Sequence, residues 1–283
     1  MKSILGALIF SSLAFSIQAQ NSKKDYLFKL KTSFGDMTVL LYEETPLHKA
    51  NFIELAKAGR YDSTFFHRVM ENFMIQGGDI FRKPNEKKGS DDDAIPAEIV
   101  EGLFHKKGEL AAARQPDNVN PEKKSSSCQF YIVQGKVYPE AELTTDQDKF
   151  NRVFGELMMA GKLDSLRQQL IALQKEKKID EMNTLIAQSK PLCEELSGEN
   201  LSKAIDPDKL KAYSTVGGTP HLDGEYTVFG RVVEGLDVID KIAAVEIKPR
   251  NEPVERIYMQ VEVLEMKKKQ ITKLYGYTYP EKK

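Results

Sequence analysis

The sequence predicts a mainly β domain that is interrupted by an α-helical insertion. Apolar and polar side chains alternate in two separate stretches, residues 25–136 and 220–266, as expected for half-buried strands. Between them, in residues 137–219, apolar side chains recur every three or four positions, which is the spacing of amphipathic helices. Helical sequence between two β-rich blocks indicates a helical subdomain inserted into a β fold.

The first β stretch is predicted to open with a hairpin and a helix. Residues 26–41 keep a period of two on both sides of a central Gly-Asp turn. A helix is expected next, because Thr45 is a good N-cap residue, Pro46 suits the first helical position and Gly59 can end the helix. Such a helix would cover one end of the sheet.

The insertion is predicted to form three or four amphipathic helices. Leucines and other apolar residues repeat at helical spacing, and Pro191, Gly198 and Pro207 punctuate the later part. Strand-like alternation returns at residues 227–233 and 257–263. The C-terminal tail, residues 267–283, is basic and then rich in tyrosine, without periodicity. The tail either packs a few tyrosines on the domain or frays.

Composition excludes several classes of protein. The chain has 283 residues, 41% of them hydrophobic, and a formal net charge of −1, so it is neither disordered nor broadly basic as a nucleic-acid-binding chain would be. Two cysteines rule out a disulfide scaffold and an all-cysteine zinc site. The four histidines lack the spacing of metal ligands. We expect no metal and no cofactor, and interpret residues 91–93, three aspartates, as a solvated loop rather than a cation site.

The N-terminus has the layout of a secretory signal peptide. A lysine precedes an uncharged run, residues 4–17, that is too short to span a bilayer, and Ala19 offers a small residue for cleavage. Residues 1–19 are therefore predicted to be removed, which leaves an exported protein, periplasmic or secreted, with no stable membrane insertion; an uncleaved anchor is the alternative. In an oxidising compartment Cys128 and Cys193 either pair or remain two free thiols.

The most informative segment is the run from Phe65 to Asp79. Arg68 and Gln76 lie among large apolar residues, next to the pair Gly77-Gly78. A buried arginine is costly unless it is hydrogen-bonded or serves a ligand, and paired glycines let the backbone bend or approach a partner closely. The alternative from the residues alone is an arginine at a strand edge, followed by a plain turn.

This run resembles the signature of the cyclophilins, the cyclophilin-type peptidyl-prolyl cis-trans isomerases. Residues 108–114, 127–132 and 222–232 resemble three further blocks of that family, in the same order along the chain. The resemblance covers residues 25–136 and 220–266, close to a whole cyclophilin domain. It implies a closed eight-stranded antiparallel barrel capped by two helices, an architecture that leaves no free sheet edge.

The resemblance also implies an activity and the residues that carry it. Rotation about a peptide bond is opposed by a barrier of about 18–20 kcal/mol, because the nitrogen lone pair is delocalised into the carbonyl. Catalysis needs a donor where that resonance is lost and a slot for the proline ring, but no nucleophile, metal or cofactor. By matching positions, Arg68 and Gln76 are the catalytic pair. The positions implied to bind substrate are His67, Phe73, Met74, Ala113, Arg114, Gln129, Tyr131, Leu222, His221 and Tyr226.

Four positions depart from the pattern of the family. Tyr131 stands where phenylalanine is common, Arg114 where the eukaryotic form has asparagine, and Tyr226 where it has histidine. The arginine is expected to raise the local charge of the groove. His221 occupies the position where many eukaryotic members carry tryptophan. We therefore expect isomerase activity with weak binding of cyclosporin.

The sequence thus predicts a peptidyl-prolyl isomerase that assists the folding of exported proteins, with proline-containing unfolded or extended polypeptides as partners. The alternative is a binding or chaperone module of the same fold with little catalysis. The insertion is expected to emerge beside the site, as a partner-binding arm, a lid or an inert decoration. Its mixed charge argues against a nucleic-acid partner.

Overall fold

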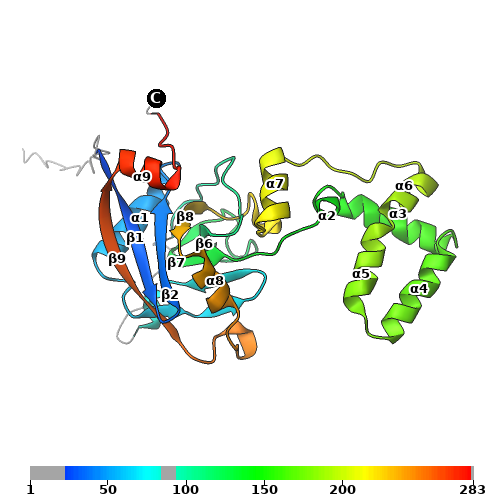
Figure 1. Ribbon diagram of the computed structural model, residues 1–283, viewed down its shortest axis with the longest axis horizontal. Coiled ribbons are helices and arrows are strands. Elements are labelled where there is room, and N and C mark those ends of the chain that lie inside the picture. Colours follow the sequence, from blue (N-terminus) through cyan, green and yellow to red (C-terminus); the bar gives the residue numbers. More distant parts are fainter. Residues whose placement is uncertain (1–22, 84–93, 282–283) are drawn as a thin grey trace, which may run out of the picture.

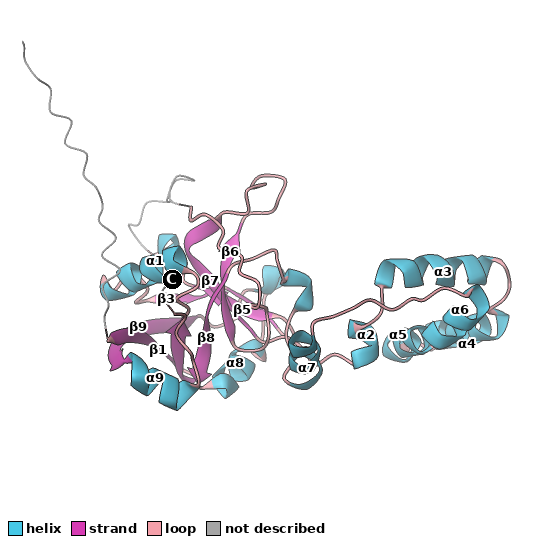
Figure 2. Cartoon of the chain, turned by 90° about the horizontal axis from the view of Figure 1, so that it is seen from above, coloured by secondary structure: helices cyan, strands magenta, loops and turns pink. Residues whose placement is uncertain are grey.

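The computed structural model describes residues 23–83 and 94–281. The predicted signal peptide, residues 1–19, and the aspartate run at residues 91–93 lie outside these ranges. Figure 1 shows a β-rich body from which a helical arm projects, and Figure 2 shows the same arrangement from above. The body is built from the two β stretches, and the arm from the insertion between them.

Within the described residues, nine strand segments form one antiparallel sheet that curls into a nearly closed barrel. Their order across the sheet is β3-β9-β1-β2-β8-β6-β7-β5-β4. The segments are β1 Lys24–Thr32, β2 Gly35–Leu41, β3 Thr64–Phe66, β4 Arg68–Met70, β5 Met74–Gly77, β6 Glu109–Arg114, β7 Ser125–Val133, β8 Val228–Glu234 and β9 Ile257–Lys267.

The barrel closes because its two outermost segments are consecutive in the chain. Only His67 separates β3, which pairs with β9, from β4, which pairs with β5. The backbone N–H of His67 donates to the carbonyl of Gln76 at 3.0 Å, so the ladder to β5 continues through this residue. The expected eight strands therefore become nine segments, because one strand changes partner at His67.

The description as mainly β is too simple, because helices account for 37% of the structure and strands for 27%. The helices are α1 Pro46–Lys57, α2 Glu140–Leu143, α3 Gln147–Met159, α4 Asp164–Lys175, α5 Ile179–Gln188, α6 Lys190–Ser197, α7 Pro207–Thr215, α8 Leu236–Ala243 and α9 Lys268–Tyr275. The insertion thus holds six helices rather than three or four. One more helix, α9, forms in the tail, where no periodicity indicated it.

The predicted hairpin and first helix are present, with a different cap. Strands β1 and β2 pair up to the turn, where Thr32 lies opposite Gly35. Helix α1 begins after Thr45, but the Thr45 side chain makes no capping hydrogen bond. Instead, the carboxylate of Glu98 accepts from the backbone N–H groups of Leu47 and His48, at 3.0 and 2.9 Å. A carboxylate at this position also interacts favourably with the helix dipole.

The two helices expected to cap the barrel are α1 and α8. Both contribute buried apolar side chains, such as Phe52 and Ile239, to the same core as the strand residues. The C-terminal tail is packed rather than frayed as far as it is described: the hydroxyl of Tyr277 donates to Glu44 and also accepts from the backbone N–H of Glu43.

The insertion has two parts. Helices α3 to α6 enclose a core of their own, with Phe150, Leu170 and Cys193 among its buried residues. Helix α7 packs instead against the barrel through Tyr213 and Phe104, and Figures 1 and 2 both place it beside the β body. The chain enters and leaves the outer part at adjacent points, because Thr145 and Ser202 form an antiparallel bridge. We call residues 146–201 the distal arm.

The structure also settles the state of the cysteines. Cys128 is buried in the barrel and Cys193 in the core of the distal arm, and both are free thiols. Across residues 23–83 and 94–281, no helix combines the length and apolar character needed to cross a membrane.

Candidate active site

The predicted catalytic pair is brought together by strand register. Arg68 on β4 lies opposite Gln76 on β5, and Gln76 in turn lies opposite Tyr131 on β7. The guanidinium of Arg68 donates to the side-chain oxygen of Gln76 at 3.3 Å, and its other terminal nitrogen lies 3.2 Å from the sulfur of Met70. Arg68 is half-buried, so part of its fork of donors is left for a ligand.

Two further side chains hold Gln76 in place. Its amide nitrogen donates to the oxygen of Gln129 at 3.1 Å, and the amide of Gln129 donates to Asp79 at 3.1 Å. Asp79 also accepts from Arg82 at 3.2 Å and caps a short 3-10 helix by accepting from the N–H of Phe81. The chain of hydrogen bonds therefore runs from a fixed backbone turn to the guanidinium of Arg68. Asp79 follows Gly77-Gly78 directly in the motif, but its anchoring role was not predicted.

A cluster of apolar side chains adjoins the guanidinium. Five of the positions implied to bind substrate belong to this cluster, which we call the proline pocket; three of them are buried and two are partly buried. They are Met74, Tyr131, Leu222, Phe73 and Tyr226. The guanidinium carbon of Arg68 lies 5.9 Å from the centre of the Phe73 ring. A cationic donor thus lies beside an apolar surface that is able to receive a proline ring.

A groove of about 620 Å³ runs next to this pocket. Gln76, Gln129, Ala113 and Arg114 are among its lining residues, so it unites both predicted glutamines with the two groove positions on β6. The pairing of β6 with β7 shifts register between Ala112 and Arg114. A bulge of this kind redirects side chains at a strand end, which explains how two consecutive residues both reach the groove.

Arg114 does not leave the groove more positive, contrary to our expectation. Its guanidinium is paired with Asp117 at 2.5 Å and with Glu225 at 3.2 Å, and its side chain is only 4% exposed. It also lies 4.6 Å from the centre of the Tyr226 ring. Glu225 also pairs with Lys123 at 2.7 Å, so the two carboxylates offset the charges of these two cations, and Arg114 connects the groove loops.

The two predicted histidines lie in different surroundings. His221 is exposed and its ring stacks on Phe73, with centroids 5.4 Å apart, so it covers the edge of the pocket as a larger aromatic residue would. His67 is buried and packs edge-on against Phe65, outside the pocket cluster. Burial, assisted by the positive charge of Arg82, lowers the pKa of His67 to about 4. His67 is therefore neutral at physiological pH, and a direct substrate contact by it stays a prediction.

The hydroxyl of Tyr131, the departure from the common phenylalanine, has a buried partner. It lies 2.9 Å from the Nε2 atom of His105, which is fully buried, and His105 in turn contacts Asp223. Neither His105 nor Asp223 was among the predicted site residues. The histidine was considered only as a metal ligand, and its proximity to Tyr131 arises from tertiary packing.

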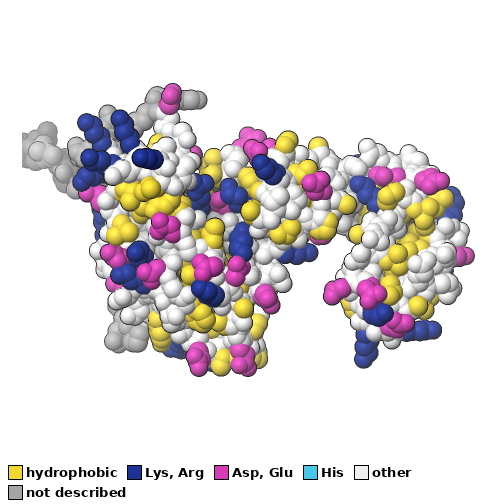
Figure 3. All heavy atoms as spheres, viewed as in Figure 1, with side chains coloured by type: hydrophobic (Ala, Val, Ile, Leu, Met, Phe, Trp, Pro, Cys, Tyr) yellow, Lys and Arg dark blue, Asp and Glu magenta, His cyan; other side chains and the backbone are white. Residues whose placement is uncertain are grey.

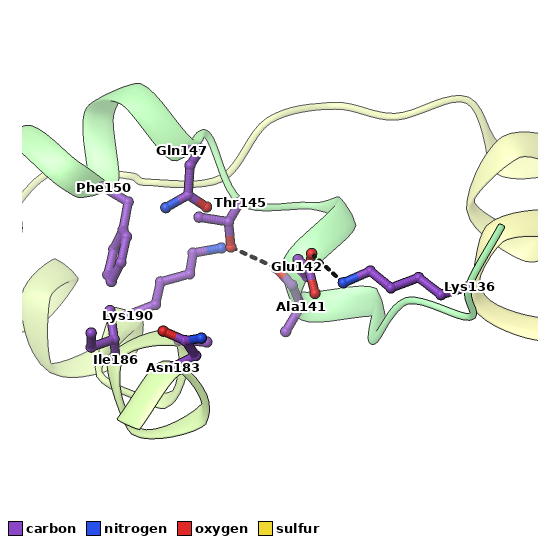
Figure 4. Close-up of a pocket in the computed structure, with 10 residues that line it drawn as sticks. Lys136, Ala141, Glu142, Thr145, Gln147, Phe150, Asn183, Ile186 and Lys190 are labelled. Atoms are coloured by element: carbon purple, nitrogen blue, oxygen red, sulfur yellow. Dashed lines mark hydrogen bonds and ion pairs between the residues drawn. The ribbon is translucent and has the colours of Figure 1, made fainter. Parts of the chain in front are cut away.

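A second hollow, of about 370 Å³, lies away from these residues in the insertion. Most of its lining residues come from α2, α3, α5 and the start of α6, as Figure 4 shows. There Lys136 pairs with Glu142 at 3.8 Å, and the hydroxyl of Thr145 donates to the carbonyl of Ala141. The hollow contains none of the predicted site residues. In the described part of the chain, no group of three or more metal-binding side chains is found.

One protein-family model matches most of this chain. The family model "Cyclophilin type peptidyl-prolyl cis-trans isomerase/CLD" matches residues 27–184 and 206–263. The chain belongs to this family. The gap in the match falls inside the insertion, and the second matched segment begins just before α7 of this cyclophilin.

Two relatives illustrate the similarity in sequence. A "Putative bifunctional phosphatase/peptidyl-prolyl cis-trans isomerase" of Streptococcus pyogenes is 29% identical over 82% of this chain, which spans 37% of that longer protein. A "Putative peptidyl-prolyl cis-trans isomerase" of Staphylococcus saprophyticus is 28% identical over 83% of this chain and 90% of the relative. Among solved structures, a Cryptosporidium parvum cyclophilin-type isomerase matches with 16% identity and a TM-score of 0.49, over 84% of this chain and 96% of that one.

Proposed function

We propose that this cyclophilin accelerates rotation about Xaa-Pro bonds in exported polypeptides and so assists their folding. The observation that carries the proposal is the guanidinium of Arg68, held by Gln76 beside the apolar ring of Phe73. Export rests on the sequence of residues 1–19, and proline-containing chains are the substrates that such a pocket fits.

In the proposed mechanism the protein provides a hydrogen-bond donor and a binding surface for the proline ring, and no covalent bond forms between enzyme and substrate. The proline ring lies against Met74, Tyr131 and Leu222, and the preceding residues lie along the groove. As the peptide bond twists, its nitrogen loses resonance and becomes a better hydrogen-bond acceptor. Arg68, always charged and already oriented, donates to it there and stabilises the twisted state more than either planar isomer.

The distribution of charge supports a polypeptide substrate. On the face shown in Figure 3, acidic and basic side chains are interspersed over both the body and the arm. Basic side chains gather at the end of the body where α9 lies, and over the rest of this face neither sign forms a continuous field of the kind that would favour a phosphate backbone. The groove charge at Arg114 is internally paired, so it leaves room for extended chains of varied sequence.

Refolding of a proline-limited protein tests the proposed role. Uncatalysed prolyl isomerisation takes tens of seconds at 25 °C. Residues 20–283 in catalytic amount should shorten that slow phase, whereas a rate unaffected by the enzyme would contradict the proposal. Export is tested separately by mass spectrometry of the protein recovered from cells, which should begin at Gln20. Protein that retains Met1 would exclude cleavage.

A second role, gripping unfolded clients, is favoured by the surface of the distal arm. Met159, Ile179 and Leu192 are 81%, 50% and 41% exposed on its helices. A binding function predicts that loss of the distal arm weakens the affinity for an unfolded protein but leaves turnover of a short peptide intact. Unchanged affinity for the unfolded protein would remove this second role.

A further inference from the structure

We propose that helix α7 of the insertion positions the proline pocket, through a buried network centred on Asp223. The network rests on the proposed function, because it acts on a wall of the same pocket. Its members, from the insertion to the pocket, are Lys209, Tyr213, Asp223, His105 and Tyr131.

The first part of the network fixes the carboxylate of Asp223 to α7. The ammonium of Lys209 donates to one oxygen at 2.9 Å, and the hydroxyl of Tyr213 donates to the other at 2.8 Å. Tyr213 is fully buried and packs edge-on against Phe104, so it cannot easily swing away. Asp223 immediately follows the pocket residue Leu222, and α7 therefore holds the loop that carries this part of the pocket.

The second part connects Asp223 to His105. The Asp223 oxygen that receives the Tyr213 hydroxyl also accepts from the backbone N–H of His105 at 2.9 Å, and it lies 3.1 Å from Nδ1 of the ring. Burial opposes ionisation of Asp223, but hydrogen bonds from His105, Lys209 and Tyr213 outweigh it and lower the carboxyl pKa to about 2. An ionised carboxylate only accepts hydrogen bonds, so a proton of the His105 ring is assigned to Nδ1.

The third part reaches the pocket. Nε2 of the His105 ring and the hydroxyl of Tyr131 lie 2.9 Å apart and form a hydrogen bond. The two rings are nearly parallel, at 13°. A buried hydroxyl without a partner is costly, so this bond fixes the polar end of Tyr131 away from the pocket. The ring can then form the pocket wall as phenylalanine would.

Close backbone packing gives the same connection a second support. The N–H of Thr219, on the segment that leaves α7, donates to the carbonyl of His105 at 2.8 Å. A Cβ atom added at Gly218 would lie only 2.3 Å from that carbonyl oxygen and 2.5 Å from the ring of Tyr213. The exit of the insertion thus fits directly against His105, and the two cannot shift independently.

A double-mutant cycle tests this network. Lys209→Met and Tyr213→Phe each remove one hydrogen bond to Asp223 and should raise the KM for the peptide Ala-Ala-Pro-Phe about threefold to tenfold, with little change in kcat. In a Tyr131→Phe background the same substitutions should change KM by less than about twofold, because the final hydrogen bond is already absent. Two matched controls are expected to behave as the parent protein: Lys211→Met, at an exposed position of α7, and Tyr138→Phe, whose ring packs at the edge of the Tyr213 cluster beside Lys136.

Two results would overturn the network: an unchanged KM in Lys209→Met and Tyr213→Phe, or an equal loss in both backgrounds. The second result would show that α7 supports the fold without acting through the Tyr131 hydroxyl. Should the parent protein fail to accelerate exchange, the proposed function fails but the network can still be measured. The same variants are then compared by the Kd of Ala-Ala-Pro-Phe, measured by calorimetry, and the same fold-changes are expected. Unchanged affinities would refute the network.

Discussion

The hydrogen bond between Gln76 and Arg68 makes a specific prediction about catalysis. Gln76→Leu keeps the approximate size of the side chain but removes both the acceptor for Arg68 and the donor to Gln129. The guanidinium would then keep its contact with the sulfur of Met70, a weak acceptor, and its position beside the Phe73 ring. We expect the substitution to release Arg68 from its position without emptying the pocket.

The structure gives the size of this effect. A hydrogen bond to a charged group contributes about 1.5–3 kcal/mol, and the Arg68–Gln76 distance of 3.3 Å is long for such a bond, so the lower end of that range applies. The predicted loss is therefore about 1.5 kcal/mol, or roughly tenfold in kcat/KM. Because Gln76 orients the donor instead of holding the proline ring, most of the loss should be in kcat.

The assay is NMR exchange between the cis and trans forms of a short Xaa-Pro peptide, with each variant at equal concentration. Gln129→Leu acts one bond further from Arg68 and should lose less activity than Gln76→Leu. Gln174→Leu, the same change at an exposed position on the distal arm, is the matched control. A Gln76→Leu protein that is folded and fully active would refute the reasoning, because Arg68 would then need no anchor.

Three further predictions concern stability and the insertion. Because burial first, and then Arg82, lowers the pKa of His67 to about 4 from 6.5, its contribution to stability is complete above pH 6.5 and is lost as the pH falls towards 4. The loss is at most about 3 kcal/mol. Urea unfolding of the parent and of His67→Gln should show it as a different dependence of the unfolding free energy on pH. A titration of His67 near pH 6.5 by NMR would contradict the prediction. Replacing the distal arm, residues 146–201, by a short glycine linker should leave peptide turnover within about twofold of the parent. Removal of residues 137–219 should impair turnover, because α7 is lost. Equal activity of the two deletion variants would contradict the division of the insertion into two parts. Gly218→Ala should cost about 1–3 kcal/mol of unfolding free energy, since its Cβ would overlap the carbonyl of His105, and a protein as stable as the parent would disprove that overlap.

The parts of the fold that the sequence predicted well are those set by local pattern. Alternation located the hairpin of β1 and β2, and the turn between them needed Gly35, whose φ is +125°. Only the position of the helix cap was predictable. Thr45 marked the start of α1, but the side chain that caps its backbone N–H groups is Glu98, from a distant segment. Helix α9 was missed because its single buried residue, Ile271, gives no repeated pattern.

The candidate site divides in the same way. The motif around Arg68 is contiguous, and strand register alone brings Gln76 and Tyr131 beside it. His105 and Asp223 lie in segments that are far apart in sequence and meet only in the folded chain. Their recognition required the knowledge that Tyr131 is buried, because only a buried hydroxyl demands a partner.

The insertion was the least predictable region. The spacing of apolar residues predicted its helical character, but it also led us to expect residues 137–219 to form a single unit. The structure instead assigns α7 to the barrel side through Tyr213, and the distal arm to a separate core. Helical periodicity identifies a buried face, but it does not identify the surface against which that face packs.

The central claim is that Arg68 drives isomerisation, and peptide exchange tests it most directly. NMR exchange rates of a short Xaa-Pro peptide are measured with residues 20–283 and with the Arg68→Ala variant, alongside urea unfolding of both. We predict rapid exchange with the parent protein and a loss of about 100-fold or more in the variant. The unfolding free energy should change by less than about 1 kcal/mol, since Arg68 is only half-buried. Equal exchange rates in the two folded proteins would contradict the account.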